Sequence, residues 1–346
     1  MYKKDFCGSN VQHFAVPQPI ALECGRTLHN VSIAYHTYGS LNATKDNVVW
    51  VCHAFTANSD VTDWWPDMVG EGLLLDTSRY FVVCANILGS CYGTTGPMSL
   101  NPQTNRPYCL DFPEITVRDM IAAHRRLQQH LGIRKINTIV GGSIGAMQAL
   151  EWAVSEPDLF DNLVFSAAGA KTTPWVIAVN EAQRMAIEAD PTFFKNRAKG
   201  GEEGMKAARA MALLSYRNYN TYNATQQEST HEKISDFRAS SYQRYQGQKL
   251  VNRFDAYAYY RLSQAMDSFD VGRSRGSVED ALSRVKARSI IIGISSDILF
   301  PTGEQKWVTQ HIPGAVYAEI ESQFGHDGFL IENKKLTKVI GDFLRK

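Results

Sequence analysis

Three residues far apart in this sequence carry the side chains that nucleophilic acyl chemistry requires. They are Ser143, Asp297 and His326, in that order along a chain of 346 residues. A serine hydroxyl is a weak nucleophile at neutral pH, so it needs a base such as histidine, and the base needs a carboxylate to orient it. Together, these residues predict a serine nucleophile with its own proton relay.

The serine lies in a glycine-rich turn between a predicted strand and a predicted helix. Residues 136–140 form an apolar, β-branched run, and residues 146–153 are rich in helix formers. The turn between them, GGSIG, has the GxSxG spacing that lifts a nucleophilic serine clear of a sheet edge. Glycine is expected on both sides because a Cβ there would collide with neighbouring backbone. The alternative is that Ser143 only caps the helix.

Asp297 and His326 each follow a predicted strand. Asp297 ends the run SIIIGISSD at 289–297, and His326 lies in the loop SQFGHDGF, just past the run at 315–322. The order serine, acid, histidine is the one found with a strand–turn–helix nucleophile. Both side chains are therefore expected beside Ser143. Taken singly, Asp297 could cap a helix and His326 could be an ordinary loop histidine.

The negative oxygen formed when serine attacks an acyl group needs two N–H donors. The amide of Ile144, the residue after the serine, is one candidate. The turn HAFTA at 53–57 closes the strand-like run NVVWVC and offers the second, with Phe55 the expected donor.

Arg209 and Tyr216 lie in the helical segment at 204–216, seven positions apart, so two helical turns bring them to one face. A guanidinium among small and apolar residues is suited to a carboxylate. Asp327, beside the histidine, could take an ammonium group. These residues would hold an amino acid with its side-chain hydroxyl toward Ser143. The alternative is a solvated arginine on an amphipathic helix.

The elements that must position these residues alternate between strands and helices. Short apolar runs at 47–55, 79–88, 136–142, 162–168, 289–297 and 315–322 alternate with helical patterns such as residues 116–132, which end at a glycine. This alternation predicts the α/β class, with a mainly parallel sheet covered on both faces. Strand-like runs disappear from 173 to 287. We therefore expect a catalytic core formed by 1–172 and 288–346, with a helical insertion at 173–287.

Composition excludes several other classes. The formal net charge is +1, which does not favour nucleic acid or an anionic membrane as a partner, and no apolar run approaches the roughly 20 residues of a membrane span. The first ten residues have no apolar stretch of the signal-peptide type. A cytoplasmic location is therefore expected.

No metal or disulfide site is predicted. The cysteines at 7, 24, 52, 84, 91 and 109 form no CxxC pair, and free thiols are the favoured interpretation. His53 with Asp60 and Asp63 matches no metal-ligand spacing, so a structural histidine is favoured.

Beyond these individual motifs, the chain resembles the homoserine O-acetyltransferases of the α/β-hydrolase fold over nearly its whole length. The segments that carry the resemblance are CANILGSCYGTTGPMSLNP, DFPEITVRDM, GGSIGAMQALEWA, NEAQRMAI, YQGQKLVNRFDAYAY, SSDILFP and GHDGFL. The resemblance implies an α/β-hydrolase core with a helical lid, and transfer of acetyl from acetyl-CoA to L-homoserine by a ping-pong route. This reaction leads toward methionine. Acetyl-CoA is a co-substrate here, and no bound cofactor is implied.

The resemblance also implies roles for individual residues. Ser143 is the nucleophile, His326 the base and Asp297 its orienter, and the Phe55 and Ile144 amides form the oxyanion hole. Arg209 binds the substrate carboxylate, with Tyr216, Asp327 and Thr56 also assigned to substrate binding. A homodimer is implied, in which the helical insertions form the contact and cover an active-site tunnel.

Two departures from the family pattern leave alternatives open. GGSIGAMQ stands where GGSMGGMQ is usual, and HAFTA stands where HALTG is usual. The second change brings Phe55 beside the acyl pocket, where a narrow pocket would favour acetyl over succinyl. Relatives that use succinyl-CoA or accept serine are one alternative. The others are an esterase that admits water and a non-catalytic protein with this fold.

Overall fold

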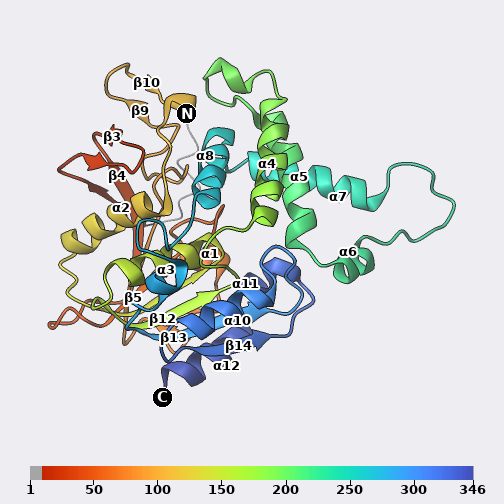
Figure 1. Cartoon of the computed structure of the whole chain (residues 1–346). Coiled ribbons are helices and arrows are strands. Elements are labelled where there is room, and N and C mark those ends of the chain that lie inside the picture. The colour runs from red at the N-terminus through yellow and green to blue at the C-terminus, as the bar shows by residue number, and fades with distance from the viewer. Residues whose placement is uncertain (1–9, 346) are drawn as a thin grey trace.

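A computed structural model describes residues 10–345. Its main feature is an eight-stranded sheet (Figure 1). The strands, in spatial order, are β1 (Gln12–Ala15), β4 (Ser32–Tyr38), β8 (Phe81–Ala85), β5 (Val48–Cys52), β11 (Ile136–Gly142), β12 (Phe160–Ser166), β13 (Arg288–Ile294) and β14 (Val316–Ile320). β4 runs antiparallel to both of its neighbours, whereas the six strands from β8 to β14 are parallel. The predicted mainly parallel sheet is confirmed.

Both faces of the sheet are covered by helices. Along β5, Val48, Trp50 and Cys52 belong to one buried cluster, while Val49 and Val51 belong to another. This alternation follows from the two-residue period of a strand, and it explains why the strand is apolar throughout. The first cluster includes residues of α2 (Val117–His130), α3 (Ile144–Ser155) and α10 (Thr302–His311), and the second includes residues of α1 (Val61–Trp64), α11 (Gly328–Ile331) and α12 (Asn333–Leu344).

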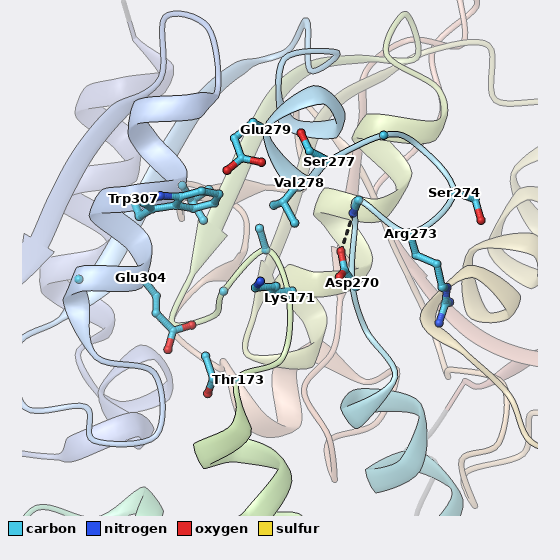
Figure 2. Close-up of a pocket in the computed structure, with 16 residues that line it drawn as sticks. Lys171, Thr173, Asp270, Arg273, Ser274, Ser277, Val278, Glu279, Glu304 and Trp307 are labelled. Atoms are coloured by element: carbon cyan, nitrogen blue, oxygen red, sulfur yellow. Dashed lines mark hydrogen bonds between the residues drawn. The ribbon is translucent and has the colours of Figure 1, made fainter.

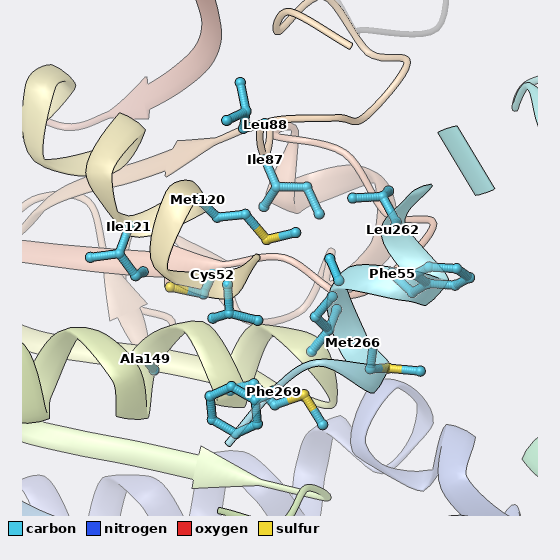
Figure 3. Close-up of a cluster of buried hydrophobic side chains, with 14 of the residues drawn as sticks. Cys52, Phe55, Ile87, Leu88, Met120, Ile121, Ala149, Leu262, Met266 and Phe269 are labelled. Carbon is cyan, nitrogen blue, oxygen red and sulfur yellow. The ribbon is translucent and has the colours of Figure 1, made fainter. Parts of the chain in front are cut away.

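A helical segment separates β12 from β13. It contains α4 (Pro174–Glu188), α5 (Glu202–Tyr216), α6 (Tyr219–Gln226), α7 (Arg238–Val251), α8 (Ala256–Asp267) and α9 (Val278–Leu282). In Figure 1, α4 to α7 extend away from the sheet. Helix α8 is different, because its residues Leu262 and Met266 pack in the same buried cluster as Met120 and Ala149 of the core (Figure 3). The extended helices are thus joined to the core through α8.

Shorter elements complete the fold. They are three two-stranded pairs, β2 (Ile20–Ala21) with β3 (Thr27–Leu28), β6 (Val69–Gly70) with β7 (Leu75–Asp76), and β9 (Leu100–Asn101) with β10 (Arg106–Pro107), and the 3₁₀ turns η2 (Cys109–Asp111), η3 (Phe193–Lys195) and η4 (Gly325–Asp327). None of the helices in the described part of the chain is long and apolar enough to cross a membrane. Cys24, Cys52, Cys84 and Cys109 are free thiols, as expected, and Cys7 lies outside the described residues.

Candidate active site

Ser143 occupies a strained turn between β11 and α3. Its φ of 57° is in the left-handed region that side chains rarely adopt, and the residue is buried. A Cβ on Gly141 would lie 2.2 Å from the carbonyl oxygen of Gly145, and a Cβ on Gly145 would lie 2.2 Å from that of Cys52. Glycine is therefore required at both positions because the first turn of α3 lies in close contact with the ends of β11 and β5. Neither position requires glycine for its φ value.

The three predicted residues meet at the carboxyl ends of β11, β13 and β14. The Ser143 hydroxyl donates to Nε2 of His326 at 2.9 Å, and Nδ1 of His326 donates to Oδ2 of Asp297 at 2.7 Å. The Ser143 side chain makes no capping hydrogen bond to α3. The arrangement is a hydroxyl–imidazole–carboxylate relay, the geometry that activates a serine.

Asp297 is held rigidly by its own loop. Its Oδ1 accepts the backbone N–H groups of Leu299 at 2.8 Å and Phe300 at 2.9 Å, which leaves Oδ2 for the histidine. Burial disfavours a charged imidazole at His326, but the Asp297 carboxylate, together with the more weakly acting Asp327, outweighs burial and raises the pKa of His326 above its ordinary value. The histidine is therefore poised to accept the serine proton.

Aromatic rings enclose the histidine. The ring centroids of Tyr216, Phe300 and Phe329 lie 5.6, 5.4 and 5.3 Å from that of His326. Tyr216 comes from α5 in the helical segment, and the other two rings come from the core. His326 is only 4% exposed. These rings keep bulk water away from the relay and strengthen its hydrogen bonds.

The two expected oxyanion donors follow neighbouring strands. β5 pairs with β11 so that Cys52 lies opposite Gly141, and Phe55 and Ile144 each follow three residues later. Within residues 10–345, neither amide donates to a protein acceptor outside the regular helix and strand hydrogen bonds. The ring of Phe55 is buried in the core cluster (Figure 3) and meets that of Tyr259 edge-on, with centroids 4.7 Å apart.

Thr56, the next residue, is tied to the returning part of the helical segment. Its carbonyl oxygen accepts Nη1 of Arg253 at 2.5 Å and its hydroxyl accepts Nη2 at 3.3 Å. Arg253 also donates to the Tyr92 hydroxyl. The loop that carries Phe55 is thereby anchored to the helical segment.

Arg209 and Tyr216 share one face of α5, as the spacing predicts. The guanidinium carbon of Arg209 lies 5.6 Å from the centroid of the Tyr216 ring, and Arg209 forms no ion pair within the described chain. Burial raises the pKa of Tyr216 to about 12, so its hydroxyl stays protonated. An unpaired cation next to the ring that covers His326 is available to a substrate anion.

Asp327 already has a partner. Its Oδ2 lies 3.3 Å from Nη1 of Arg217, the residue after α5. A substrate ammonium at Asp327 would therefore share the carboxylate with Arg217.

His53 has a structural role in this fold. Its Nδ1 donates to the carbonyl oxygen of Ala54 at 2.8 Å and its Nε2 accepts the amide of Ile87 at 3.0 Å, so both nitrogens are used. Burial lowers the pKa of His53 to about 4 and keeps the ring neutral. Asp60 accepts the Tyr38 hydroxyl and Asp63 an amide N–H of Asn58. The described residues include no group of three or more histidine, cysteine or acidic side chains that could hold a metal ion.

Comparison with known families defines the class of this site. Residues 47–332 match the family model described as alpha/beta hydrolase fold, the class in which a strand–turn–helix serine works with an acid and a histidine. Curated relatives narrow this further. The chain is 47% identical over 330 residues to "Homoserine O-acetyltransferase" of Cyclobacterium marinum, covering 95% of this chain and 94% of the relative. It is 43% identical to the protein of the same name in Chlorobaculum tepidum, covering 100% and 98%. The chain belongs to the homoserine O-acetyltransferase family.

Solved structures agree with this assignment. A homoserine O-acetyltransferase from Bacillus anthracis superposes with a TM-score of 0.89 at 26% identity, over 97% of this chain and 98% of that one. The esterase E22 superposes with the same TM-score at 24% identity, over 97% and 99%, and shows the shared fold alone. The resemblance described from the sequence motifs is therefore confirmed.

Three neighbours of the site were not predicted from the sequence. Tyr259 packs on Phe55, Arg253 holds Thr56, and Arg217 pairs with Asp327. All three come from the helical segment, where aromatic and basic residues are frequent. For Tyr259, the aromatic run AYAYY in α8 is the one sequence feature that could have indicated a residue of the site. Such a run is equally typical of core packing.

Proposed function

We propose that this protein transfers the acetyl group of acetyl-CoA to the hydroxyl of L-homoserine through an acetyl-Ser143 intermediate, giving O-acetyl-L-homoserine and CoA in cytoplasmic methionine biosynthesis. The observation that carries the proposal is the continuous relay from Ser143 through His326 to Asp297 in a chain of this family. The relay provides the nucleophile, and the family relationship provides the acyl group and acceptor.

In the first half-reaction, His326 takes the Ser143 proton as Oγ attacks the thioester carbon. The Ile144 and Phe55 amides hold the resulting oxyanion, and each such donor is worth about 3 kcal/mol. The C–S bond then breaks, and His326 gives the proton to the CoA thiolate. Ser143 is left as an acetyl ester. The raised pKa of His326 supports this shuttling, because the protonated ring is stabilised by Asp297.

In the second half-reaction, homoserine occupies the space vacated by CoA. Arg209 binds its carboxylate, with Tyr216 and Thr56 beside it and Asp327 near its ammonium group. His326 removes the proton of the substrate hydroxyl, which attacks the acetyl-serine carbon, and then returns that proton to Ser143. The unpaired guanidinium of Arg209 beside Tyr216 supports the carboxylate assignment.

We also propose acetyl as the preferred acyl group. Phe55 is buried and its ring is packed against Tyr259, whose hydroxyl donates to Gln183. A ring held from behind in this way cannot swing aside for a longer acyl chain at low free-energy cost. This argument favours acetyl over the longer, charged succinyl group.

The helical insertion, 173–287, is proposed as a lid and dimer contact on the core of 1–172 and 288–346. Its helices expose large apolar side chains that water disfavours, 41–62% exposed, at Trp175, Met185, Met211, Leu214 and Tyr245. Light scattering tests the homodimer. The unmodified protein should have the mass of two chains, and Leu214→Glu should shift this mass toward that of one chain. A mass of one chain for the unmodified protein would refute the homodimer.

The function is tested by free-thiol release from acetyl-CoA and from succinyl-CoA, each with L-homoserine, L-serine or no acceptor. We expect rapid continuous release only with acetyl-CoA plus homoserine. Continuous release without acceptor would mean that water discharges the acyl-enzyme, and an esterase would replace the transferase. Faster release with succinyl-CoA would overturn the acetyl assignment alone.

A further inference from the structure

A cavity lies outside the relay, where the helical insertion joins the core. Its volume is about 770 Å³, within the range of small-molecule sites. One wall is the segment 169–173, which leads into α4; another is the segment 270–279, which returns from α8; the third is the start of α10 (Figure 2). We call it the hinge cavity.

The two connecting segments are paired at the hinge cavity. Lys171 and Asp270 form an antiparallel bridge, and the amide of Thr172 donates to the carbonyl oxygen of Phe269 at 2.8 Å. A molecule bound here would touch both connections between core and insertion at once.

Two oppositely charged groups in the hinge cavity have no protein partner. Lys171 is exposed, Glu304 is partly buried, and neither forms an ion pair or a side-chain hydrogen bond within the described part of the chain. A Cβ on Gly169 would lie 2.3 Å from Oε2 of Glu304, so the glycine leaves the space that this carboxyl group uses. Burial, and then repulsion from Asp297, raise the pKa of Glu304 to about 7. A nearby cation would stabilise the ionised form of this carboxyl group, and the described residues place no cation in contact with it.

Other charged residues around the hinge cavity are already engaged. Oδ1 of Asp270 accepts the amide of Gly272 at 2.8 Å, and Nη2 of Arg273 contacts Oε2 of Glu23 at 2.6 Å. Glu279 lies in the first turn of α9, and hydrogen bonds from its own amide and from Ser277 lower its pKa. Among the described charged residues of this lining, Lys171 and Glu304 are therefore the two whose side chains form neither a hydrogen bond nor an ion pair.

The hinge cavity also has an apolar surface. The indole of Trp307, 36% exposed, lies at its edge next to Glu304 (Figure 2). It is backed by the ring of His311, with centroids 4.1 Å apart, and Val278 and Val308 complete the apolar lining. Aromatic and aliphatic surfaces of this kind accept an uncharged side chain.

We propose that the hinge cavity binds a free α-amino acid with an apolar side chain. Its ammonium group would pair with Glu304, its carboxylate with Lys171, and its side chain would lie against Trp307. This site is distinct from the proposed acceptor site at Arg209, and its occupancy does not depend on the proposed function.

Binding here would reach the relay through α10. Glu304 follows Asp297 by seven residues, and the intervening Leu299 and Phe300 amides hold the Asp297 carboxylate. Because Lys171 lies in one connector and is bridged to Asp270 of the other, the ligand would bias the position of the lid as well. The hinge cavity is thus placed to modulate turnover.

Calorimetric titration with L-leucine tests the proposal. The titration uses the Arg209→Ala protein, so that leucine binding at the acceptor site is suppressed. Saturable binding is expected, and 4-methylpentanoate, isoamylamine and glycine, which lack the ammonium, carboxylate and side chain, should each bind at least tenfold more weakly. No saturable heat with leucine would overturn the proposal.

Variants assign the binding to this cavity. Lys171→Met and Glu304→Gln, each in the Arg209→Ala protein, should weaken leucine binding about tenfold or more, and Gly169→Ala should do so by displacing Glu304. Lys334→Met, at an exposed lysine of α12, is the matched control and should leave binding unchanged. Equal affinity in all four variants would refute the site. Loss in Lys334→Met as well would also refute it, because the effect would then follow net charge alone.

Discussion

Nε2 of His326 lies 2.9 Å from the hydroxyl oxygen of Ser143, although 183 residues separate them in the sequence. The two residues follow β14 and β11, which are brought to the same edge by the parallel order of the sheet. The whole helical insertion lies between them in the chain. The relay is therefore a product of the sheet topology. Substitutions in the relay should lower the catalytic rate much more than they lower the stability of the fold.

Ser143→Ala should reduce kcat by about a thousandfold or more, because no other hydroxyl of residues 10–345 bonds to His326 Nε2. The side chain makes no capping bond to α3, so the unfolding midpoint in urea should change little. Steady-state thiol release and a urea titration measure the two effects. Retention of more than a thousandth of the activity would contradict the assigned nucleophile.

The pH profile should report His326. Activity needs the neutral ring, and Asp297 raises the pKa of His326, so kcat/KM should fall as pH drops through a value above the ordinary histidine pKa of about 6.5. In Asp297→Asn the burial effect is opposed only by Asp327, so this acid limb should move to lower pH while kcat falls by roughly 10³–10⁴-fold. An acid limb at the same pH in both proteins would exclude His326 as its origin.

Arg209→Ala should affect only the second half-reaction. The KM for homoserine should rise by roughly 10–100-fold, since a charged hydrogen bond contributes about 1.5–3 kcal/mol, while the first-turnover release of CoA stays the same. Lys206→Ala is the matched control, because Lys206 lies on the same helix and pairs with Glu203 at 2.6 Å. Stopped-flow thiol detection separates the half-reactions. A slowed first turnover would move Arg209 to the CoA side of the mechanism.

Gly145 should be intolerant of even one methyl group. Gly145→Ala would bring Cβ to 2.2 Å from the Cys52 carbonyl oxygen and should destabilise the fold by about 1–3 kcal/mol. Gly303→Ala in α10, where a Cβ meets nothing within 4 Å, should instead stabilise it by about 0.5–1 kcal/mol. Urea midpoints compare the two variants, and equal midpoints would show that the tight approach of α3 to β5 is unimportant.

The site's central residues could be predicted because local rules govern them. The GxSxG turn follows a recognisable strand, and Asp297 and His326 follow two others, so parallel topology alone brings them together. Arg209 and Tyr216 were correctly paired because seven residues make two helical turns.

What the sequence did not predict depends on contacts between distant segments. β4 was missed because His36 and Thr37 interrupt its apolar pattern, although the strand is mostly buried between β1 and β8. The ion pair of Asp327 with Arg217 and the packing of Tyr259 on Phe55 join the insertion to the core. No local spacing encodes such pairs, because the position of the insertion over the sheet is set by tertiary packing.

The central claim is an acetyl group carried on Ser143, and intact-protein and peptide mass spectrometry test it most directly. The protein is mixed with acetyl-CoA alone, quenched within one turnover, and compared with a sample chased with L-homoserine. The account predicts a mass gain of one acetyl group, located on the peptide containing Ser143, absent in Ser143→Ala and removed by homoserine with formation of O-acetylhomoserine. Product formation with no acetylated enzyme at any time would contradict it, since the acetyl group would then pass directly from CoA to the acceptor.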